Sequence, residues 1–175
     1  AKYYNNTTTW GIAGYGQVAI RDIWPGMTFT AGLRYDYEKT ELDYRDSLLF
    51  SGSEQYSSYH QSNKKRDFDA WLPKFSLLQQ WNSQLSLYLS ISKGYKAGGY
   101  NIISNDMSSQ LVQLQYNAEK LWNYEIGMKY FSQNHKFNLN AAVFFIDWKD
   151  QQIFTMGMMG PALKNAGDAH SVGCE

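Results

Sequence analysis

The 175-residue chain has little of what marks disulfide-rich, helical membrane or nucleic-acid-binding proteins. Its one cysteine, Cys174, cannot form a disulfide within the chain, and we interpret it as a small apolar residue. The formal net charge is +0, so no overall electrostatic field favours nucleic acid as a partner. The longest apolar run, residues 141–146, is far shorter than the roughly 20 residues that a membrane-spanning helix needs.

The sequence also lacks a recognisable catalytic constellation. The three histidines lie in separate predicted loops without the spacing of metal ligands: His60, His135 and His170. Glycines 94, 98 and 99 do not precede a predicted helix, so a phosphate-binding loop is a poor interpretation. Asp147 and Asp150 have opposite parity on one predicted strand and would not act as a pair. We therefore expect no enzyme activity, no metal site and no cofactor.

The N-terminus shows no sign of a targeting segment. Residues 1–5 lack the apolar core of a signal peptide. We therefore expect the chain to be a mature or excised piece of a longer protein.

Strict alternation of apolar and polar residues is the main positive signal. Between residues 84 and 92, leucine and isoleucine occupy every odd position, while serine, glutamine and tyrosine occupy the even ones. A period of two predicts a β-strand with one apolar and one polar face. A helix would spread the same apolar residues around its whole circumference, so the alternation disfavours a helix.

The same pattern recurs along the chain and predicts an all-β fold of about seven antiparallel, up-and-down strands. The predicted strands cover residues 10–21, 27–45, 67–81, 84–92, 120–130, 136–154 and 164–175. The second is much longer than the 5–6 residues typical of strands in globular proteins. Pro73 predicts a bulge or local irregularity, because proline cannot donate to a ladder. Apolar residues at both parities in 144–148 predict a bulge or a plugged interior there.

Short and long connections alternate along the chain. Tight turns are predicted near residues 22–26, 82–83 and 132–135, and long polar loops near 46–65, 97–118 and 155–163. This asymmetry is typical of an outer-membrane β-barrel, which has short turns on the periplasmic side and long loops outside. The mean hydropathy of −0.52 fits such a barrel, in which only every second residue faces lipid, but it also fits a soluble all-β domain.

Tryptophans and tyrosines support the barrel interpretation. Aromatic residues make up 17% of the chain, which is enough to supply two interfacial girdles. Trp10, Trp71 and Trp122 are predicted near the outer ends of their strands, whereas Trp24 and Trp81 fall at the inner turns. An amphipathic ring prefers the depth of the lipid headgroups, so this distribution favours a membrane barrel.

Five motifs in order resemble the TonB-dependent outer-membrane receptors, in particular siderophore receptors. They are residues 31–36 (AGLRYD), 93–101 (KGYKAGGYN), 119–129 (EKLWNYEIGMK), 144–152 (FFIDWKDQQ) and 165–175 (NAG followed by GCE). Residues 93–102 also resemble the ferric-yersiniabactin (pesticin) receptor branch of that family. The positions that match the motifs include Gly94, Gly98, Gly99, Glu119, Asn123, Glu125, Asp147 and Asn165.

The resemblance implies a 22-stranded transmembrane barrel closed by an N-terminal plug domain. Residues 1–175 would then be part of the barrel, without the plug and without the C-terminal strands. The implied function is TonB-dependent uptake of a ferric siderophore across the outer membrane of a Gram-negative bacterium. The implied partners are the siderophore, the TonB complex (through the plug) and outer-membrane lipid.

Candidate ligand-binding residues follow from the same resemblance, because iron-loaded siderophores are often anionic and bind near the outer rim. The candidates are Arg34, Tyr44, Arg45, Arg66, Lys93, Tyr100 and Asn101. An alternative is that Arg34, together with Asp36, Glu38 and Lys129, forms ion pairs with the plug or with neighbouring strands. The methionines at 156, 158 and 159 are expected to form an adaptable contact surface or to pack within their loop.

Two further functional alternatives remain open at this stage. The first is a TonB-dependent receptor for another nutrient, such as vitamin B12, haem or a glycan. The second is a self-standing β-rich binding module, such as a lectin-like sandwich or a small adhesin barrel.

Overall fold

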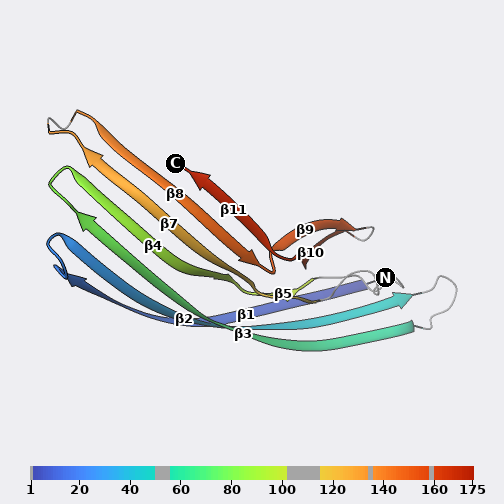
Figure 1. Ribbon diagram of the computed structural model, residues 1–175. Coiled ribbons are helices and arrows are strands. Elements are labelled where there is room, and N and C mark those ends of the chain that lie inside the picture. The colour runs from blue at the N-terminus through green and yellow to red at the C-terminus, as the bar shows by residue number, and fades with distance from the viewer. Residues whose placement is uncertain (1, 50–55, 102–114, 134–135, 158–159) are drawn as a thin grey trace.

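The computed structural model describes residues 2–49, 56–101, 115–133, 136–157 and 160–175 (Figure 1). The described residues form one seven-stranded antiparallel sheet and two small hairpins. The strand order in the main sheet is β1-β2-β3-β4-β7-β8-β11, so each strand of the sheet pairs with the next one along the chain. This confirms the all-β, antiparallel, up-and-down fold. The sheet does not close in this chain, and β1 and β11 form its two edges.

Most strands of the main sheet are long. They are β1 (Lys2–Arg21), β2 (Met27–Leu49), β3 (Tyr56–Gln80), β4 (Leu85–Lys96), β7 (Glu119–Phe131), β8 (Asn138–Lys149) and β11 (Ala169–Cys174). The predicted tight turns near 22–26 and 82–83 join β1 to β2 and β3 to β4. The one near 132–135 falls between β7 and β8, and its residues 134–135 lie outside the described residues. No helix of the described residues is long and apolar enough to cross a membrane.

The first three strands extend much further than the alternation predicted. The β1–β2 ladder reaches from Arg21↔Thr28 to Lys2↔Ser47, and the β2–β3 ladder continues to Leu49↔Tyr56. The prediction of a loop over residues 46–65 was therefore wrong for most of its length. The reason is that backbone pairing continues after the apolar parity ends, and polar cross-strand pairs take over.

The last predicted strands are divided differently in the structure. The predicted strand 136–154 breaks at Asp150, which has a positive φ of 55° and separates β8 from β9 (Gln152–Gly157). The prediction of a loop over residues 155–163 was wrong for its described part, which belongs to β9 and to the strand paired with it, β10 (Gly160–Asn165). Residues 158–159 lie outside the described residues. Gly167, with φ of 108°, then separates β10 from β11. The predicted strand 164–175 is therefore two strands, which the alternation could not reveal.

Neither predicted bulge is present. The register of β8 runs without a shift along both β7 and β11, so residues 144–148 stay in the ladder. The Phe144 ring packs against Gly173 on β11, where any Cβ would collide with the ring. Pro73 likewise pairs with Leu33 in an unshifted ladder, but it lies one residue beyond the last β3–β4 pair, Lys74↔Ser92.

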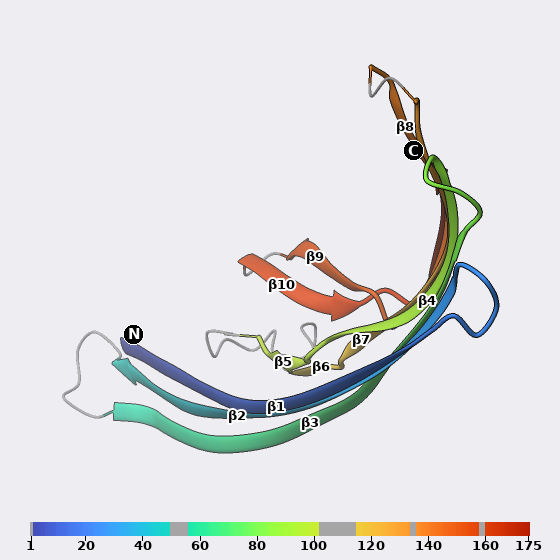
Figure 2. The same cartoon turned by 90° about the vertical axis from the view of Figure 1, so that its left-hand side faces the viewer.

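Within the predicted loop 97–118, of which residues 102–114 lie outside the described residues, β5 (Gly99–Tyr100) pairs with β6 (Gln115–Tyr116) as a short hairpin. Figure 2 shows that the main sheet is curved and that the β5–β6 and β9–β10 hairpins lie on its concave side. The described residues with buried side chains are few and gather where β2 and β3 meet the β5–β6 hairpin. Among them are Thr40, Leu42, Phe68, Ala70, Tyr100 and Asn101.

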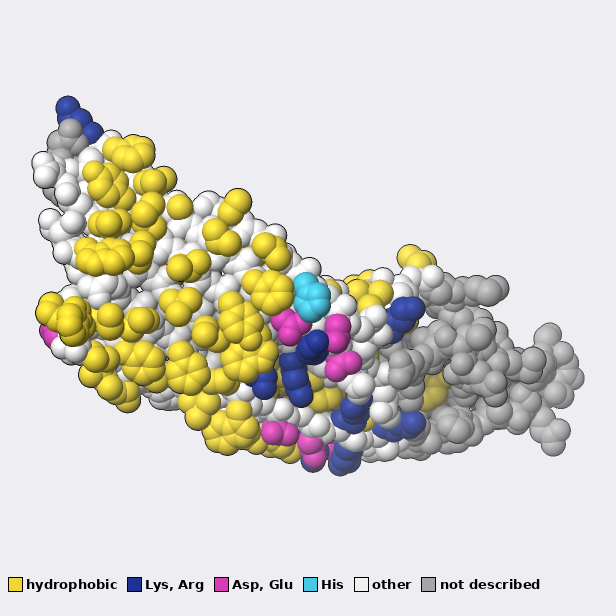
Figure 3. Space-filling view, in the orientation of Figure 1, with side chains coloured by type: hydrophobic (Ala, Val, Ile, Leu, Met, Phe, Trp, Pro, Cys, Tyr) yellow, Lys and Arg dark blue, Asp and Glu magenta, His cyan; other side chains and the backbone are white. Residues whose placement is uncertain are grey.

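The opposite, convex face exposes apolar side chains. Figure 3 shows them spread over β4, β7 and β8 and ending at a belt of charged side chains. Ile126 and Val143, a cross-strand pair on β7 and β8, are 56% and 53% exposed. No second sheet of the described residues covers this face. Contiguous apolar surface of this kind is typical of a membrane or protein interface, and it argues against a soluble sandwich.

Five of the six tryptophans lie on this convex side or at the short turns, and four of them are half exposed or more: Trp10, Trp24, Trp71 and Trp81. The sixth, Trp148, has the opposite parity to the exposed Val143 on β8 and so lies on the concave side. Trp10 packs against Tyr37, and Trp71 against Tyr35, with ring centroids 5.5 and 4.7 Å apart. The expectation that tryptophans lie near the outer strand ends was correct for Trp122 but wrong for Trp10 and Trp71. Those two lie mid-strand, because β1 and β3 continue well beyond them.

Candidate functional site

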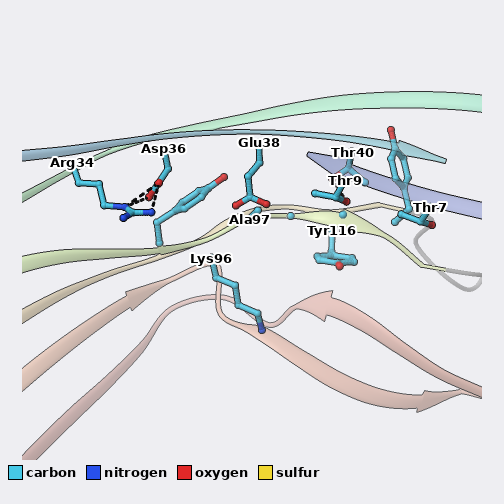
Figure 4. Close-up of a pocket in the computed structure, with 13 residues that line it drawn as sticks. Thr7, Thr9, Arg34, Asp36, Glu38, Thr40, Lys96, Ala97 and Tyr116 are labelled. Atoms are coloured by element: carbon cyan, nitrogen blue, oxygen red, sulfur yellow. Dashed lines mark hydrogen bonds and ion pairs between the residues drawn. The ribbon is translucent and has the colours of Figure 1, made fainter. Parts of the chain in front are cut away.

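A cavity of about 560 Å³ lies on the concave side of the sheet, and we call it the inner cavity (Figure 4). It opens because β4 pairs with β3 only up to Ser92, while β2 and β3 continue together. Beyond that point β4 pairs only with β7, as far as Lys96↔Glu119. The cavity is lined by β1, β2, residues 95–100 and Tyr116.

One wall of the inner cavity comes from alternate residues of β1 and β2. They are Thr7, Thr9, Arg34, Asp36, Glu38 and Thr40. Alternation along a strand places these residues on one face. The hydroxyls of Thr9 and Thr40 are hydrogen-bonded across the strands at 3.1 Å.

The charges around the inner cavity are partly neutralised within the wall. Arg34 Nε donates to both carboxylate oxygens of Asp36, at 3.0 and 2.9 Å, and a terminal guanidinium nitrogen lies 2.7 Å from Oδ1. Among the described residues, Glu38 and Lys96 have no ion-pair partner. The cavity therefore offers one ammonium, one carboxylate and several hydroxyls to a ligand.

Three tyrosines complete the lining: Tyr95, Tyr100 and Tyr116. They lie further from the short turns than the ladder pair of Lys93 and Trp122 does. Burial raises the pKa of Tyr95 to about 12, with smaller contributions from the carboxylates of Glu38, Asp69 and Asp36. Burial also raises the pKa values of Tyr100 and Tyr116. The hydroxyl oxygens of Tyr95 and Tyr100 are buried without a hydrogen-bond partner among the described residues. All three phenols are therefore neutral at physiological pH.

Gly98 and Gly99 let the floor of the inner cavity approach its neighbours closely. A Cβ on Gly98 would collide with the Tyr116 carbonyl and the Phe68 ring, and one on Gly99 would collide with the Tyr116 ring. The Arg66 guanidinium stacks on Phe68 at 4.9 Å from its centroid. These two motif glycines are thus required for packing.

Arg66 and Asn101 lie beside the inner cavity and bind backbone. Arg66 donates to the Tyr116 carbonyl (3.2 Å) and to the side-chain oxygen of Asn117 (3.1 Å). Asn101 Nδ2 donates to the Leu163 carbonyl (2.7 Å), and the Leu163 N–H donates to Asn101 Oδ1 (2.8 Å).

Of the seven ligand-binding candidates, the structure places Arg34 and Tyr100 in the lining of the inner cavity. Tyr44, Arg45 and Lys93 do not line it. Arg45 pairs with Asp43 at 2.9 Å, and Lys93 lies over the Trp122 ring at 5.9 Å.

Several of the other motif positions make contacts within the main sheet. Gly94 packs under Leu121, and Glu125 accepts a hydrogen bond from the Tyr88 hydroxyl at 2.6 Å. Asp147 lies 3.6 Å from the Lys149 ammonium and 3.1 Å from His170.

Asn123 and Glu125 line a second cavity on the inner face, of about 440 Å³, which Lys74 and Lys129 also line. Lys129 lies over the Tyr88 ring at 5.9 Å.

Sequence reasoning missed several residues that line the inner cavity: Thr7, Thr9, Thr40, Tyr95, Lys96 and Tyr116. Thr40 could have been found, because it continues the parity of Arg34, Asp36 and Glu38 along β2. The threonines of β1 could not, because they precede the region where apolar alternation marks a strand. Within the described residues, no group of histidine, cysteine, aspartate and glutamate could hold a metal ion. Met158 and Met159 lie outside the described residues, whereas Met156 is 83% exposed on β9.

Comparisons with known proteins give consistent relatives. The family described as "TonB dependent receptor-like, beta-barrel" matches residues 1–175. The pesticin receptor of Yersinia pestis is 28% identical over 144 residues, which cover 82% of this chain and 20% of the receptor. The pesticin receptor of Yersinia enterocolitica is 29% identical over the same shares of the two chains. The chain thus spans about one fifth of the length of the curated relatives it matches.

Solved structures agree with these matches. The ferric yersiniabactin uptake receptor FyuA from Yersinia pestis superposes with a TM-score of 0.76 and 25% identity, over 98% of this chain and 24% of that chain. The closed form of the ferric-catecholate import receptor Fiu from E. coli K12 gives a TM-score of 0.69 at 17% identity, over 97% of this chain and 25% of that chain. The second likeness concerns the fold alone.

Proposed function

Because the chain belongs to the TonB-dependent receptor β-barrel family, we propose that it forms part of an outer-membrane receptor for a ferric siderophore. The observation that carries the proposal is that the two faces of the sheet differ in polarity. The convex face exposes aliphatic side chains, as lipid contact requires, while the concave face holds a cavity with a polar lining. The name of the ferric yersiniabactin uptake receptor points to an iron-loaded chelate as the ligand class.

The lining of the inner cavity suits a polar, iron-bound chelate. Lys96 would attract a carboxylate or phenolate of the ligand, and the hydroxyls of Thr7 and Thr9 would accept or donate hydrogen bonds. Asp36 already neutralises Arg34, so Lys96 is the cation that remains for an anionic group. The tyrosines add apolar surface and stay uncharged.

The partners of the full receptor follow from the family. We infer that outer-membrane lipid covers the convex face and that the TonB complex acts on the receptor through a plug domain outside these 175 residues. The location would be the outer membrane of a Gram-negative bacterium.

Uptake of iron-55 by iron-starved cells that express the full-length receptor tests this proposal. We expect saturable uptake of ferric yersiniabactin or another siderophore of a panel, and we expect a protonophore to abolish it. Cells with an empty vector are the control. Absence of uptake for every ferric chelate, with the receptor present and folded in the outer membrane, would overturn the siderophore assignment.

A further inference from the structure

The β5–β6 and β9–β10 hairpins come from different connections but lie side by side on the concave side of the sheet (Figures 1 and 2). The first hairpin belongs to the link between β4 and β7, and the second to the link between β8 and β11. Strand β10 lies against β6. The inner cavity is lined by residues of the first hairpin but by none of the second.

Side-chain amides join the two hairpins. Asn101, directly after β5, exchanges two hydrogen bonds with the backbone of Leu163 on β10, as a neighbouring strand would. Asn165, the last residue of β10, accepts from the Asn117 N–H (2.7 Å) and donates to the Asn117 carbonyl (3.1 Å). Each amide thus both donates to and accepts from one backbone residue of the other connection, and Asn165 Nδ2 also donates to the Asp150 carbonyl at 2.7 Å.

Gln152, the first residue of β9, makes a third connection. Its Nε2 donates to the carbonyls of Ala97 (2.9 Å) and Asn117 (3.0 Å). Its backbone N–H donates to Glu119 Oε2 at 2.7 Å. We call Asn101, Gln152 and Asn165 the amide strap.

The strap acts on the wall of the inner cavity. Ala97 lines the cavity, and so does Tyr116, the residue before Asn117. Arg66 on β3 holds the Tyr116 carbonyl and the Asn117 side chain from the other side. The described residues around Ala97, Tyr116 and Asn117 are therefore held between the main sheet and the second hairpin, so movement of either hairpin would displace the cavity wall.

We propose that the three amides of the strap are positioning residues, which hold the two hairpins as one body and thereby set the shape of the inner cavity. The proposal rests on the proposed function only in that the cavity binds the ligand. It assigns to the β9–β10 hairpin control over a site that this hairpin does not line. Binding of a ligand in the inner cavity would reciprocally steady the β9–β10 hairpin.

Isosteric amide-to-carboxylate changes in the full-length receptor test the strap. Asn165→Asp and Gln152→Glu keep the side-chain shape but replace donors with acceptors that face backbone carbonyls. The matched control is Asn138→Asp, an exposed amide at the start of β8 on the same sheet. Hydrogen–deuterium exchange, read by mass spectrometry without any ligand, reports on both hairpins.

We expect Asn165→Asp to speed exchange in residues 96–101 and 115–119 as well as in 152–165, roughly five- to tenfold, the effect of one or two lost hydrogen bonds. The control should leave both hairpins unchanged. Faster exchange confined to residues 160–165 would overturn the proposal. If Asn165→Asp fails to assemble in the membrane, Gln152→Glu gives the same reading, since it changes a different amide of the strap.

Ligand binding supplies the second arm. With ferric yersiniabactin as the probe, strap variants should weaken binding mainly through faster dissociation, although neither side chain lines the inner cavity. If a strap variant shows faster exchange in both hairpins but binds ferric yersiniabactin with unchanged affinity, the strap does not control the shape of the ligand site. If wild-type receptor binds no probe, the siderophore assignment fails, while the exchange result still decides whether the hairpins move as one body.

Discussion

Replacing Ile126 by arginine tests whether the convex face contacts lipid. Ile126 lies on β7 between the Trp122 level and the short turn after Phe131, and it is 56% exposed. In a soluble protein, a charge at such an exposed position costs little. At the midplane of a bilayer, arginine on the lipid face of a barrel costs about 2–4 kcal/mol, falling to about 0–1 kcal/mol near the interfaces.

The chain offers a matched control in Phe137. This residue is also 56% exposed but lies beside the short turn, where the bilayer interface is expected. The free energy of unfolding of the full-length receptor in lipid vesicles, from denaturant titration, measures both variants. We expect Ile126→Arg to cost at least about 2 kcal/mol more than Phe137→Arg. Equal costs would show that Ile126 does not face lipid and would refute the assignment of the convex face.

Three further predictions concern the inner face. Gly98→Ala should lower the free energy of unfolding by about 1–3 kcal/mol, because its Cβ would collide with backbone and ring atoms, whereas Gly14→Ala, in open space, should change it little; denaturant titration compares them. Tyr88→Phe removes a hydrogen bond to a carboxylate on β7 and should cost about 1 kcal/mol in the same titration, and no loss would contradict that bond. Tyr95 should ionise near pH 12 in an absorbance titration, a transition absent from Tyr95→Phe. Since folding raises this pKa, the contribution of the neutral Tyr95 phenol to the stability of the fold is complete below about pH 10 and is lost as the pH rises to about 12. Ionisation of Tyr95 near pH 10 would contradict its burial.

The fold could be predicted from the sequence wherever one face is apolar. Alternation located the core of the main strands and the three short turns, because a one-residue shift in register would move every apolar side chain to the wrong face. It failed before residue 10 on β1, beyond residue 45 on β2 and before residue 67 on β3. There both faces of β1, β2 and β3 carry polar residues, so the ladder persists without a sequence signal.

The site was harder to predict than the fold. Gly98, Gly99, Asn101 and Asn165 were found through their motifs, but the motifs do not say what the residues contact. Their roles depend on partners distant in the sequence, such as Leu163 for Asn101 and Phe68 for Gly98. Contacts of that kind follow only from the curvature that brings the two hairpins together.

The most direct test of the central claim, that the ligand binds in the inner cavity, is to place a bulky residue on one or the other side of β1. The affinity of the full-length receptor for ferric yersiniabactin is then measured. Thr9 lines the inner cavity, whereas its neighbour Thr8 is exposed and, by alternation along the strand, faces the other side. Thr9→Trp should raise the Kd at least about tenfold, equivalent to about 1.4 kcal/mol, and Thr8→Trp should leave it within about twofold. Equal affinities for the two variants would contradict a ligand site in the inner cavity.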